Sequence, residues 1–510
     1  MNRTHLTFYA AVLLLLDFTT AARLSAQAGG LEYGPYPVGF ELIQATDFSR
    51  SFPDMDGSGF RGRPMRIYIW YPAQERGGQS LTVGDFVHMA ADDFRLSGSS
   101  APALAVNARL PVPLTKGLDE QRRRALMAQL LKSQHGIQAA PGEFPLLVLG
   151  QGLYYESPLS QVLLCEYLAS RGYIVATCPL LGTRYRLVNR SVEDLETEVR
   201  DMESVIAALR SRPNWQIKQL GVIGFDLGGM AGLVLAMRHP EVEAFLSLDC
   251  AILFPLLPGL PDSHPSYRED RFTIPWMHMT QARFIEAGRQ DSNIRFLSDK
   301  KKFGDTWIVS VPSDCHGQFS SYARFGIKGP VPGYWGPVAA NVALLHDGIC
   351  RLSADFFDAV LKKEVRAIET LQAAGTGGPF KVEFKKGAVP PASLQSLLHA
   401  INEKGLAAVR PEIDKIKAAD PAAKVLEESE LNWLAYHFLL WWGRDSEALD
   451  LFKLNVELNP GSAEAHSSIG EAYMILGRTE EAIAAFKKSL EISPDQPNVK
   501  AALENLTKNK

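Results

Sequence analysis

The feature that most constrains the fold of this 510-residue chain is an apolar run followed by a glycine-rich turn and then a helical run. Residues 220–223 are apolar and typical of a buried strand, and residues 229–238 are rich in small residues and typical of a helix. The segment Gly224-Phe-Asp-Leu-Gly-Gly229 joins them. Strand, sharp turn and helix predict that Asp226 stands at the end of a strand with its side chain pointing outward.

Further runs with the length and pattern of strands recur through the first two thirds of the chain, at 63–72, 144–149, 172–177, 242–248 and 306–311. Helical segments separate several of these runs, which predicts an α/β architecture with a mostly parallel sheet. In such a sheet, functional residues gather at the carboxyl ends of the strands. Asp226, Asp249 and His316 each follow one of the expected strands.

The combined pattern resembles the α/β-hydrolase fold, in the branch that contains the platelet-activating-factor acetylhydrolases and the dienelactone hydrolases. The resemblance covers residues 35–365. It rests on the elbow at 224–229 and on Arg-Ile-Tyr-Ile-Trp-Tyr-Pro at 66–72, Gly-Gln-Gly-Leu at 150–153, Leu-Ala-Ser-Arg-Gly-Tyr at 168–173, Ser-Leu-Asp at 247–249 and His-Gly-Gln-Phe-Ser at 316–320.

This resemblance implies roles for five residues. It places the nucleophile at Asp226, the acid at Asp249 and the histidine at His316, in the chain order that the fold uses. The backbone amides of Leu153 and Leu227 are then expected to form the oxyanion hole.

Asp226 departs from that branch, in which the nucleophile is serine or cysteine. An aspartate is ionised at neutral pH and needs no base, but its attack on an ester carbonyl gives only a mixed anhydride. Attack on a saturated carbon gives an ordinary ester, which a water activated by His316 and oriented by Asp249 can cleave. Epoxide hydrolases and haloalkane dehalogenases of this fold carry aspartate at the elbow and work in this way.

Three functional interpretations therefore stay open. Asp226 is a covalent nucleophile, or it is a base that positions water for direct attack on an ester or lactone, or the domain has lost catalysis and binds a ligand or a protein. A structural alternative also remains, in which Asp226 merely caps the helix that follows an ordinary turn.

Two of the five cysteines adjoin the expected site, since Cys250 follows Asp249 and Cys315 precedes His316. If the two loops meet, a Cys250–Cys315 disulfide is a reasonable hypothesis, although neighbours of contacting residues need not satisfy disulfide geometry.

The chain has a net charge of -4 and no basic cluster interleaved with aromatic residues, so nucleic-acid binding is not expected. It also has no motif typical of a metal site and no glycine-rich phosphate loop, so we expect no metal, nucleotide or flavin cofactor. The resemblance implies a small-molecule substrate, but no residue of the sequence identifies which molecule it is.

The first residues have the form of an export signal. Arg3 and His5 precede an apolar run at 6–16, and Ala26-Gln-Ala28 offers a cleavage site. We expect a signal peptide over 1–28 and an exported protein, periplasmic or extracellular, with an interfacial anchor as the alternative. No stable membrane span is expected, because the run is too short and no other segment is long and apolar enough.

The domains expected after the signal are a hydrolase-like domain at 29–369, a turn-rich linker at 370–391 with a short strand-like piece at 380–384, and a helical domain at 392–510. Within the last, a tetratricopeptide repeat pattern is carried by Gly470, Tyr473, Ala482, Phe486 and Pro494. A looser copy precedes it and ends at Pro460, which is 34 residues before Pro494 and matches the repeat period. Such repeats bind partners, mediate self-association or stabilise a neighbouring domain.

Overall fold

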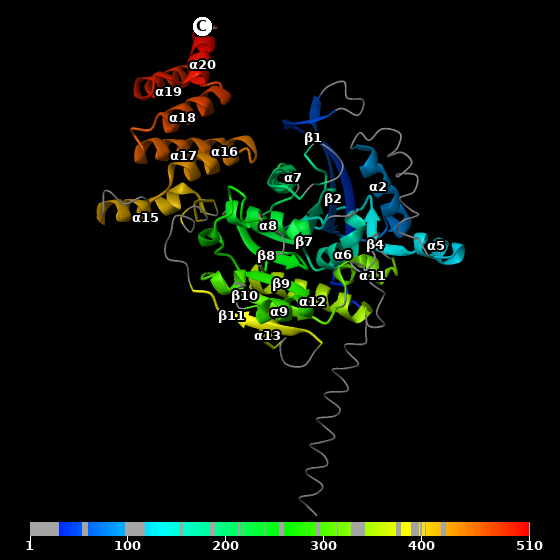
Figure 1. Cartoon of the computed structure of the whole chain (residues 1–510). Helices are drawn as coiled ribbons and strands as arrows, with labels where there is room; N and C mark the ends of the chain where they lie inside the picture. The colour runs from blue at the N-terminus through cyan, green and yellow to red at the C-terminus, as the bar shows by residue number, and fades with distance from the viewer. Residues whose placement is uncertain are drawn as a thin grey trace, which may run out of the picture. The chain divides into compact units, whose positions relative to one another are not determined.

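The computed structural model divides into two compact units (Figure 1). The sheet unit comprises Met1–Val205, Gln219–Ala236 and Val242–Gly387, and the helical unit comprises Ile206–Lys218, Met237–Glu241 and Ala388–Lys510. The residues that the structure describes are 30–53, 60–96, 118–152, 157–183, 188, 190–212, 215–217, 219–239, 241–253, 260–291, 296–313, 315–327, 342–373, 379–388, 397, 400–402, 404–419 and 425–508. The predicted signal peptide lies outside these residues.

One eleven-stranded sheet forms the core of the sheet unit, with strand order β11-β10-β9-β8-β7-β5-β6-β2-β1-β4-β3. The strands are β1 (Val38–Pro53), β2 (Phe60–Pro72), β3 (Gln79–Thr82), β4 (Leu130–His135), β5 (Leu146–Gly150), β6 (Ile174–Thr177), β7 (Leu220–Phe225), β8 (Val242–Leu248), β9 (Trp276–Gln281), β10 (Thr306–Val311) and β11 (Lys381–Lys385). The six strands from β6 to β10 in this order are parallel, and β2 and β11 pair antiparallel at their two sides. A mostly parallel sheet with a strand–elbow–helix unit at its centre is the α/β-hydrolase fold.

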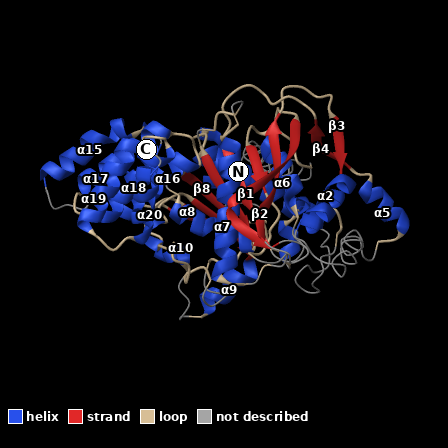
Figure 2. Ribbon diagram, turned by 90° about the horizontal axis from the view of Figure 1, so that it is seen from above, coloured by secondary structure: helices blue, strands red, loops and turns tan. Residues whose placement is uncertain are grey.

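Helices cover both faces of this sheet (Figures 1 and 2). The helices of the sheet unit are α2 (Val83–Leu96), α5 (Glu120–Met127), α6 (Val162–Ser170), α7 (Val192–Arg210), α8 (Leu227–Arg238), α9 (Ala282–Gln290), α10 (Leu297–Lys300), α11 (Ser321–Arg324), α12 (Val342–Val360) and α13 (Val365–Ala373). The carboxyl-terminal ends of α7 and α8 are counted with the helical unit.

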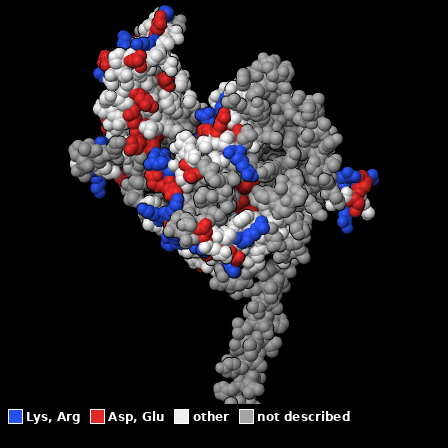
Figure 3. All heavy atoms as spheres, in the orientation of Figure 1, with Lys and Arg blue, Asp and Glu red and all other residues white. Residues whose placement is uncertain are grey.

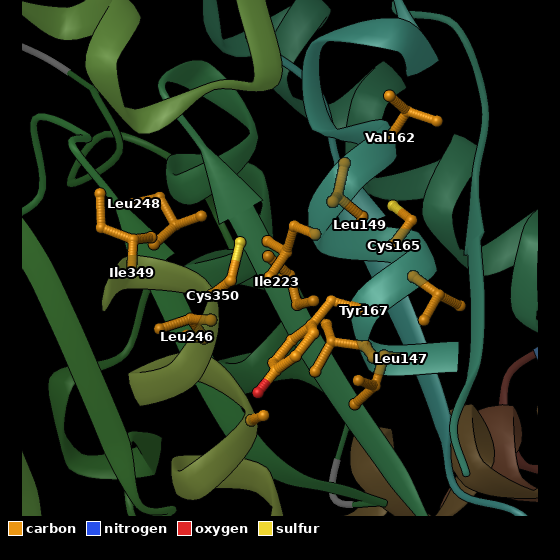
Figure 4. Close-up of a cluster of buried hydrophobic side chains, with 14 of the residues drawn as sticks. Leu147, Leu149, Val162, Cys165, Tyr167, Ile223, Leu246, Leu248, Ile349 and Cys350 are labelled. Carbon is orange, nitrogen blue, oxygen red and sulfur yellow. The ribbon is translucent and has the colours of Figure 1, made fainter. Parts of the chain in front are cut away.

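The two faces of the sheet are apolar at its centre because β5 and β7 carry apolar residues or glycine at every position rather than at alternate ones. Leu147, Ile223 and Leu246 belong to a buried cluster with residues of α6 and α12 (Figure 4). On the opposite face, a side chain at Gly232 of α8 would meet Val222 and Phe245, so α8 lies against that face. The central strands are thus fully enclosed, which fixes where their carboxyl ends emerge.

The strand-like piece predicted inside the linker belongs to the sheet and is not part of a connection between two domains. Residues 381–385 form β11 and pair antiparallel with β10, with Ile308 opposite Glu383. The side chain of Phe384 packs on Trp307, with ring centroids 5.1 Å apart. The predicted linker segment 370–391 therefore contains an edge strand of the sheet unit.

The carboxyl-terminal part of the chain is helical (Figure 2). Its helices are α15 (Leu406–Ala419), α16 (Glu428–Leu440), α17 (Asp445–Leu458), α18 (Ala463–Ile475), α19 (Thr479–Ile492) and α20 (Pro497–Lys508). Gly470 of α18 lets the ring of Phe486 on α19 approach, because an added Cβ would lie 2.7 Å from that ring. Ala482 and Phe486 are fully buried and cluster with Val499 of α20, as expected for stacked repeat helices.

The surface of these last helices carries Lys and Arg mixed with Asp and Glu on the face that Figure 3 shows. Several of these charges form exposed pairs within one helix, such as Lys488 with Glu491. Among the described helices, none combines the length and the apolar character that a membrane span needs.

Candidate active site

The sharp turn between β7 and α8 has the geometry of a strained elbow. Asp226 has a φ of 51°, a left-handed conformation that costs a non-glycine residue on the order of 1–3 kcal/mol. Two backbone hydrogen bonds hold it, from the Asp226 amide to the Leu248 carbonyl at 3.2 Å and from the Gly229 amide to the Asp226 carbonyl at 3.0 Å. Asp226 is half-buried at the end of a fully buried strand.

The glycines around Asp226 are required by close backbone approach. A Cβ on Gly228 would lie 2.2 Å from the carbonyl of Gly150, at the end of β5, and a Cβ on Gly224 would lie 2.4 Å from the carbonyl of Gly228. Only glycine fits at these two positions, because the atoms in the way are backbone. The glycine spacing therefore serves the elbow, which brings the first turn of α8 against the end of β5.

Asp249 is a buried carboxylate with four hydrogen-bond donors. It follows β8, and its oxygens accept from Thr280 Oγ1 at 2.8 Å, from the backbone amide and Nε2 of Gln281 at 3.2 and 2.7 Å, and from His316 Nδ1 at 2.8 Å. Burial by itself would raise the pKa of Asp249, but the hydrogen bonds from His316, Gln281 and Thr280 outweigh it and the pKa is lowered. The residue is thus held as a carboxylate.

His316 follows β10 and opens a short helix, η3 (His316–Phe319). Its ring is buried, and its Nδ1 faces Asp249, so Nδ1 carries the proton and Nε2 is the nitrogen left for other chemistry. The ring also stacks on that of Phe225, with centroids 4.5 Å apart and planes inclined by 14°. Because Phe225 directly precedes Asp226, this stacking places the imidazole beside the elbow.

The structure therefore brings together the ends of three strands on which the expected catalytic residues stand. Parallel pairing of β7 with β8, β8 with β9 and β9 with β10 sends these ends to one edge of the sheet. Leu227 opens α8 directly after Asp226, which is where the resemblance expects one oxyanion amide. Leu153, which was expected to supply the other amide, lies outside the described residues.

Sequence reasoning missed the residues that hold Asp249 from the side. Thr280 and Gln281 lie at the end of β9, a strand that the sequence did not predict. Their position at the carboxyl end of a parallel strand is the only signal that would have found them, and it requires the strand to be recognised first.

The structure does not contain the predicted Cys250–Cys315 disulfide. Both cysteines are buried, but the sulfur of Cys250 points toward α8, where a Cβ on Gly229 would lie 2.3 Å from it. The Cys250 side chain thus fills the space that this glycine leaves open. Burial raises the pKa of the Cys250 thiol, as for a packing residue rather than a reactive one.

Comparison with known proteins identifies one repeat in the carboxyl-terminal part of the chain. The sequence model of the tetratricopeptide repeat family matches residues 463–496, which confirms the repeat predicted there. No curated protein matches the chain. Among solved structures, the chain is similar to a ferulic acid esterase from Streptomyces cinnamoneus, with a TM-score of 0.47 and 20% identity over 69% of this chain and 97% of that chain.

Proposed function

We propose that the protein is a hydrolase in which Asp226 attacks the substrate and the Asp249–His316 pair activates water. The observation that carries the proposal is the imidazole of His316, which is oriented by a buried carboxylate at 2.8 Å and stacked against the residue that precedes Asp226. A base oriented by an acid beside a strained elbow is the arrangement of a hydrolytic triad. The finer assignment to an acetylhydrolase-like or dienelactone-hydrolase-like ancestry belongs to this proposal and rests on the sequence resemblance.

The proposed reaction proceeds in two steps. A carboxylate oxygen of Asp226 attacks a saturated carbon, and the leaving group departs with the electrons of the broken bond, which leaves an alkyl ester on the enzyme. Nε2 of His316 then takes a proton from water, and the hydroxide attacks the carbonyl carbon of that ester. The carboxylate of Asp249 stabilises the imidazolium, which gives its proton to the departing alkoxide, so that the product leaves as an alcohol. The carboxylic acid formed on Asp226 then loses its proton to solvent, which restores the carboxylate.

The substrates that suit this chemistry are epoxides and alkyl halides, since attack on saturated carbon gives an ester that water can cleave. Esters and lactones are the substrates if Asp226 instead holds water for direct attack. The test is turnover of a panel of short aryl esters, lactones, epoxides and haloalkanes by the wild type, His316→Ala and Asp226→Ser.

A covalent route gives two results that water activation does not. In His316→Ala, the alkyl ester on Asp226 should accumulate and add the mass of the alkyl group to the intact protein. A single turnover of the wild type in ¹⁸O-labelled water should place the label in the carboxylate of Asp226, because water attacks the enzyme carbonyl. Turnover of esters with neither result would establish direct water attack.

A second candidate function is binding without catalysis, and the presence of aspartate in place of serine or cysteine at the elbow favours it. In that case, the wild type turns over no member of the panel, whereas Asp226→Ser gains esterase activity from the intact His316 and Asp249. That outcome would overturn the hydrolase proposal.

The remaining proposals concern the ends of the chain. Residues 1–28 are proposed to direct export and then to be removed. Mass spectrometry of the exported protein tests this, because its amino terminus would be residue 29. The tetratricopeptide repeats are proposed to bind a protein partner or a second copy of the chain, because such repeats stack into extended binding surfaces. Light scattering over a range of protein concentrations tests self-association.

A further inference from the structure

Two histidines from distant parts of the chain meet inside the helical unit. His239 follows α8 and is only 2% exposed, and His437 lies on α16 and is half-buried. Their ring centroids are 5.1 Å apart, with the planes inclined by 86°. A ring nitrogen of one lies within 4.8 Å of a ring nitrogen of the other. Because histidine is the commonest metal ligand in proteins, a pair held this close is a candidate site for an ion.

The ring of His239 is oriented by a carboxylate. Its Nδ1 lies 2.9 Å from Oε1 of Glu241, which is itself buried and lies 3.6 Å from the guanidinium of Arg210. A carboxylate accepts hydrogen bonds, so Nδ1 of the neutral ring carries the proton and Nε2 carries the lone pair. Metal-binding histidines are commonly held in this way, because a carboxylate on one ring nitrogen fixes the tautomer and makes the other nitrogen a more basic ligand.

The ring of His437 is held in the same tautomer by the backbone. Its Nδ1 lies 2.8 Å from the carbonyl oxygen of Trp433, one turn earlier on α16. A carbonyl oxygen only accepts, so in the neutral ring Nδ1 again carries the proton and Nε2 the lone pair. The Trp433 ring packs on both histidines, with centroids 4.7 Å from His239 and 3.9 Å from His437. Both imidazoles thus have fixed orientations, which reduces the entropy that binding an ion would cost.

The separation of the two rings fits a single tetrahedral ion. Zinc binds imidazole nitrogen at about 2.0–2.1 Å, so two imidazoles on one tetrahedral zinc have their centroids about 5 Å apart. The rings of His239 and His437 are 5.1 Å apart. His437 is partly exposed, which gives an ion and its water ligands access from solvent.

We propose that His239 and His437 bind a divalent transition metal, with zinc as the expected ion, through Nε2 of each ring. Imidazole suits zinc, copper and nickel, whereas calcium and magnesium take oxygen ligands. Water completes the coordination, and binding releases any proton that Nε2 carries. The ion ties residues 237–241 to α16 within the helical unit. The sequence predicted no metal site, because the two histidines lie far apart in the chain and form no motif.

The first test counts the imidazoles on the ion. Cu²⁺, added in an amount equal to that of the purified full-length protein, should give an electron paramagnetic resonance spectrum with splitting from two nitrogens. His239→Ala and His437→Ala should each leave at most one. His466→Ala should keep the wild-type spectrum, since His466 is a histidine of the same unit whose Nε2 lies 3.1 Å from the Pro460 carbonyl oxygen. Fewer than two nitrogens in the wild type, or a wild-type spectrum in either of the first two variants, would overturn the site.

The second test measures zinc affinity by competition with a chromogenic chelator. Glu241→Gln keeps both ligands but removes the carboxylate that orients His239, so it should weaken zinc binding by about 10–100-fold. Glu457→Gln is the matched control, because it removes only an exposed pair with Arg410 and should leave the affinity unchanged. Circular dichroism confirms that each variant is folded. Equal zinc affinity in the wild type and Glu241→Gln would contradict the proposed orientation of His239.

The third test asks whether zinc binds the folded helical unit at this position. A ligand that binds only the folded state stabilises it, so zinc should raise the melting temperature of the wild type and not that of His437→Ala. An equal rise in both proteins would place the ion elsewhere and overturn the site. None of these measurements needs a substrate, and none of the residues belongs to the candidate active site, so the outcome is independent of the hydrolase proposal.

Discussion

At the residue scale, two acids of the candidate site have energetically unfavourable backbone conformations, which the surrounding fold maintains. Both Asp226 and Asp249 have positive φ, at 51° and 42°, and both stand directly after a parallel strand. Non-glycine residues rarely adopt this conformation, and those that do gather at functional sites. The sequence predicted both positions because a strand run ends just before each, but it did not show the strain.

Asp249 should contribute pH-dependent stability. Its pKa is lower in the folded protein than in the unfolded chain, so its contribution is present above the unfolded pKa of about 3.9 and is lost as pH falls through the folded value. Asp249→Asn should therefore cost about 1–3 kcal/mol of unfolding free energy at pH 7 and less in acid. Urea titrations at several pH values measure this, with the exposed Asp262→Asn as control. A cost that does not change with pH would contradict it.

Gly228→Ala tests the elbow packing. Its methyl group would lie 2.2 Å from the backbone of Gly150, which has no side chain to move away, so we expect a loss of about 3 kcal/mol. Urea denaturation measures it. Gly30→Ala is the control, because nothing lies within 4 Å of a Cβ there. Equal stability of the two variants would show that the end of β5 and the start of α8 separate easily.

At the element scale, strands with a clear apolar or alternating pattern were predictable, including β2 from the run at 63–72, and β9 was not. The runs predicted at 144–149, 172–177, 242–248 and 306–311 correspond to β5, β6, β8 and β10, and the first ends one residue before β5 does. β9 was missed because His278 and Thr280 interrupt its apolar pattern, although both are buried. His278 is accommodated by a hydrogen bond between its Nδ1 and Ser247 Oγ at 2.8 Å, and burial lowers its pKa to about 4. Such a long-range partner is invisible in a local pattern.

The buried acid Asp201 of α7 was missed for the opposite reason. It stands in a helix rich in Glu, Asp and Arg, which in sequence resembles a solvent-exposed face. The structure turns part of this charged helix inward, where Arg63 of β2 pairs with Asp201 of α7 and both are buried. Tertiary contacts between elements far apart in the chain decide which charges are buried.

The pair of Arg63 with Asp201 should stabilise the packing of β2 and α7 far more than an exposed pair does. Arg63→Met should destabilise the protein by about 3–5 kcal/mol, because it leaves a buried carboxylate with fewer partners. Arg289→Met, which removes an exposed pair with Glu383, should cost under about 1 kcal/mol. Thermal and urea unfolding compare the two. Equal losses would mean that Arg50 alone satisfies Asp201.

At the scale of the whole molecule, the chain combines two units that each have an apolar core. The core of the sheet unit gathers strands, α6 and α12, and the core of the helical unit gathers residues from Leu397 to Ala472, with a smaller cluster around Phe486. The composition change near residue 390 was visible in the sequence, and so was the repeat period. A strand-like piece at 380–384 was visible too, but its place at the edge of the sheet was not, because its pairing with β10 is a contact of the folded sheet.

Separate cores predict separable unfolding. Gly470→Val replaces a helix-interior glycine by a residue of better helix propensity, so a local effect alone would stabilise α18. The buried ring of Phe486, 2.7 Å from the added Cβ, makes the opposite outcome the expected one. Overpacking costs about 1–3 kcal/mol, which lowers the melting temperature of a unit of this size by roughly 5 °C or more.

Differential scanning calorimetry should show that Gly470→Val shifts one transition and leaves the other in place, with turnover per folded molecule unchanged. Gly461→Val is the matched control, since nothing lies within 4 Å of a Cβ at that position. If Gly470→Val shifted both transitions together, the two units would unfold as one cooperative body. Stability of the repeats would then set stability of the elbow, and partner binding to the repeats would be linked to the proposed active site.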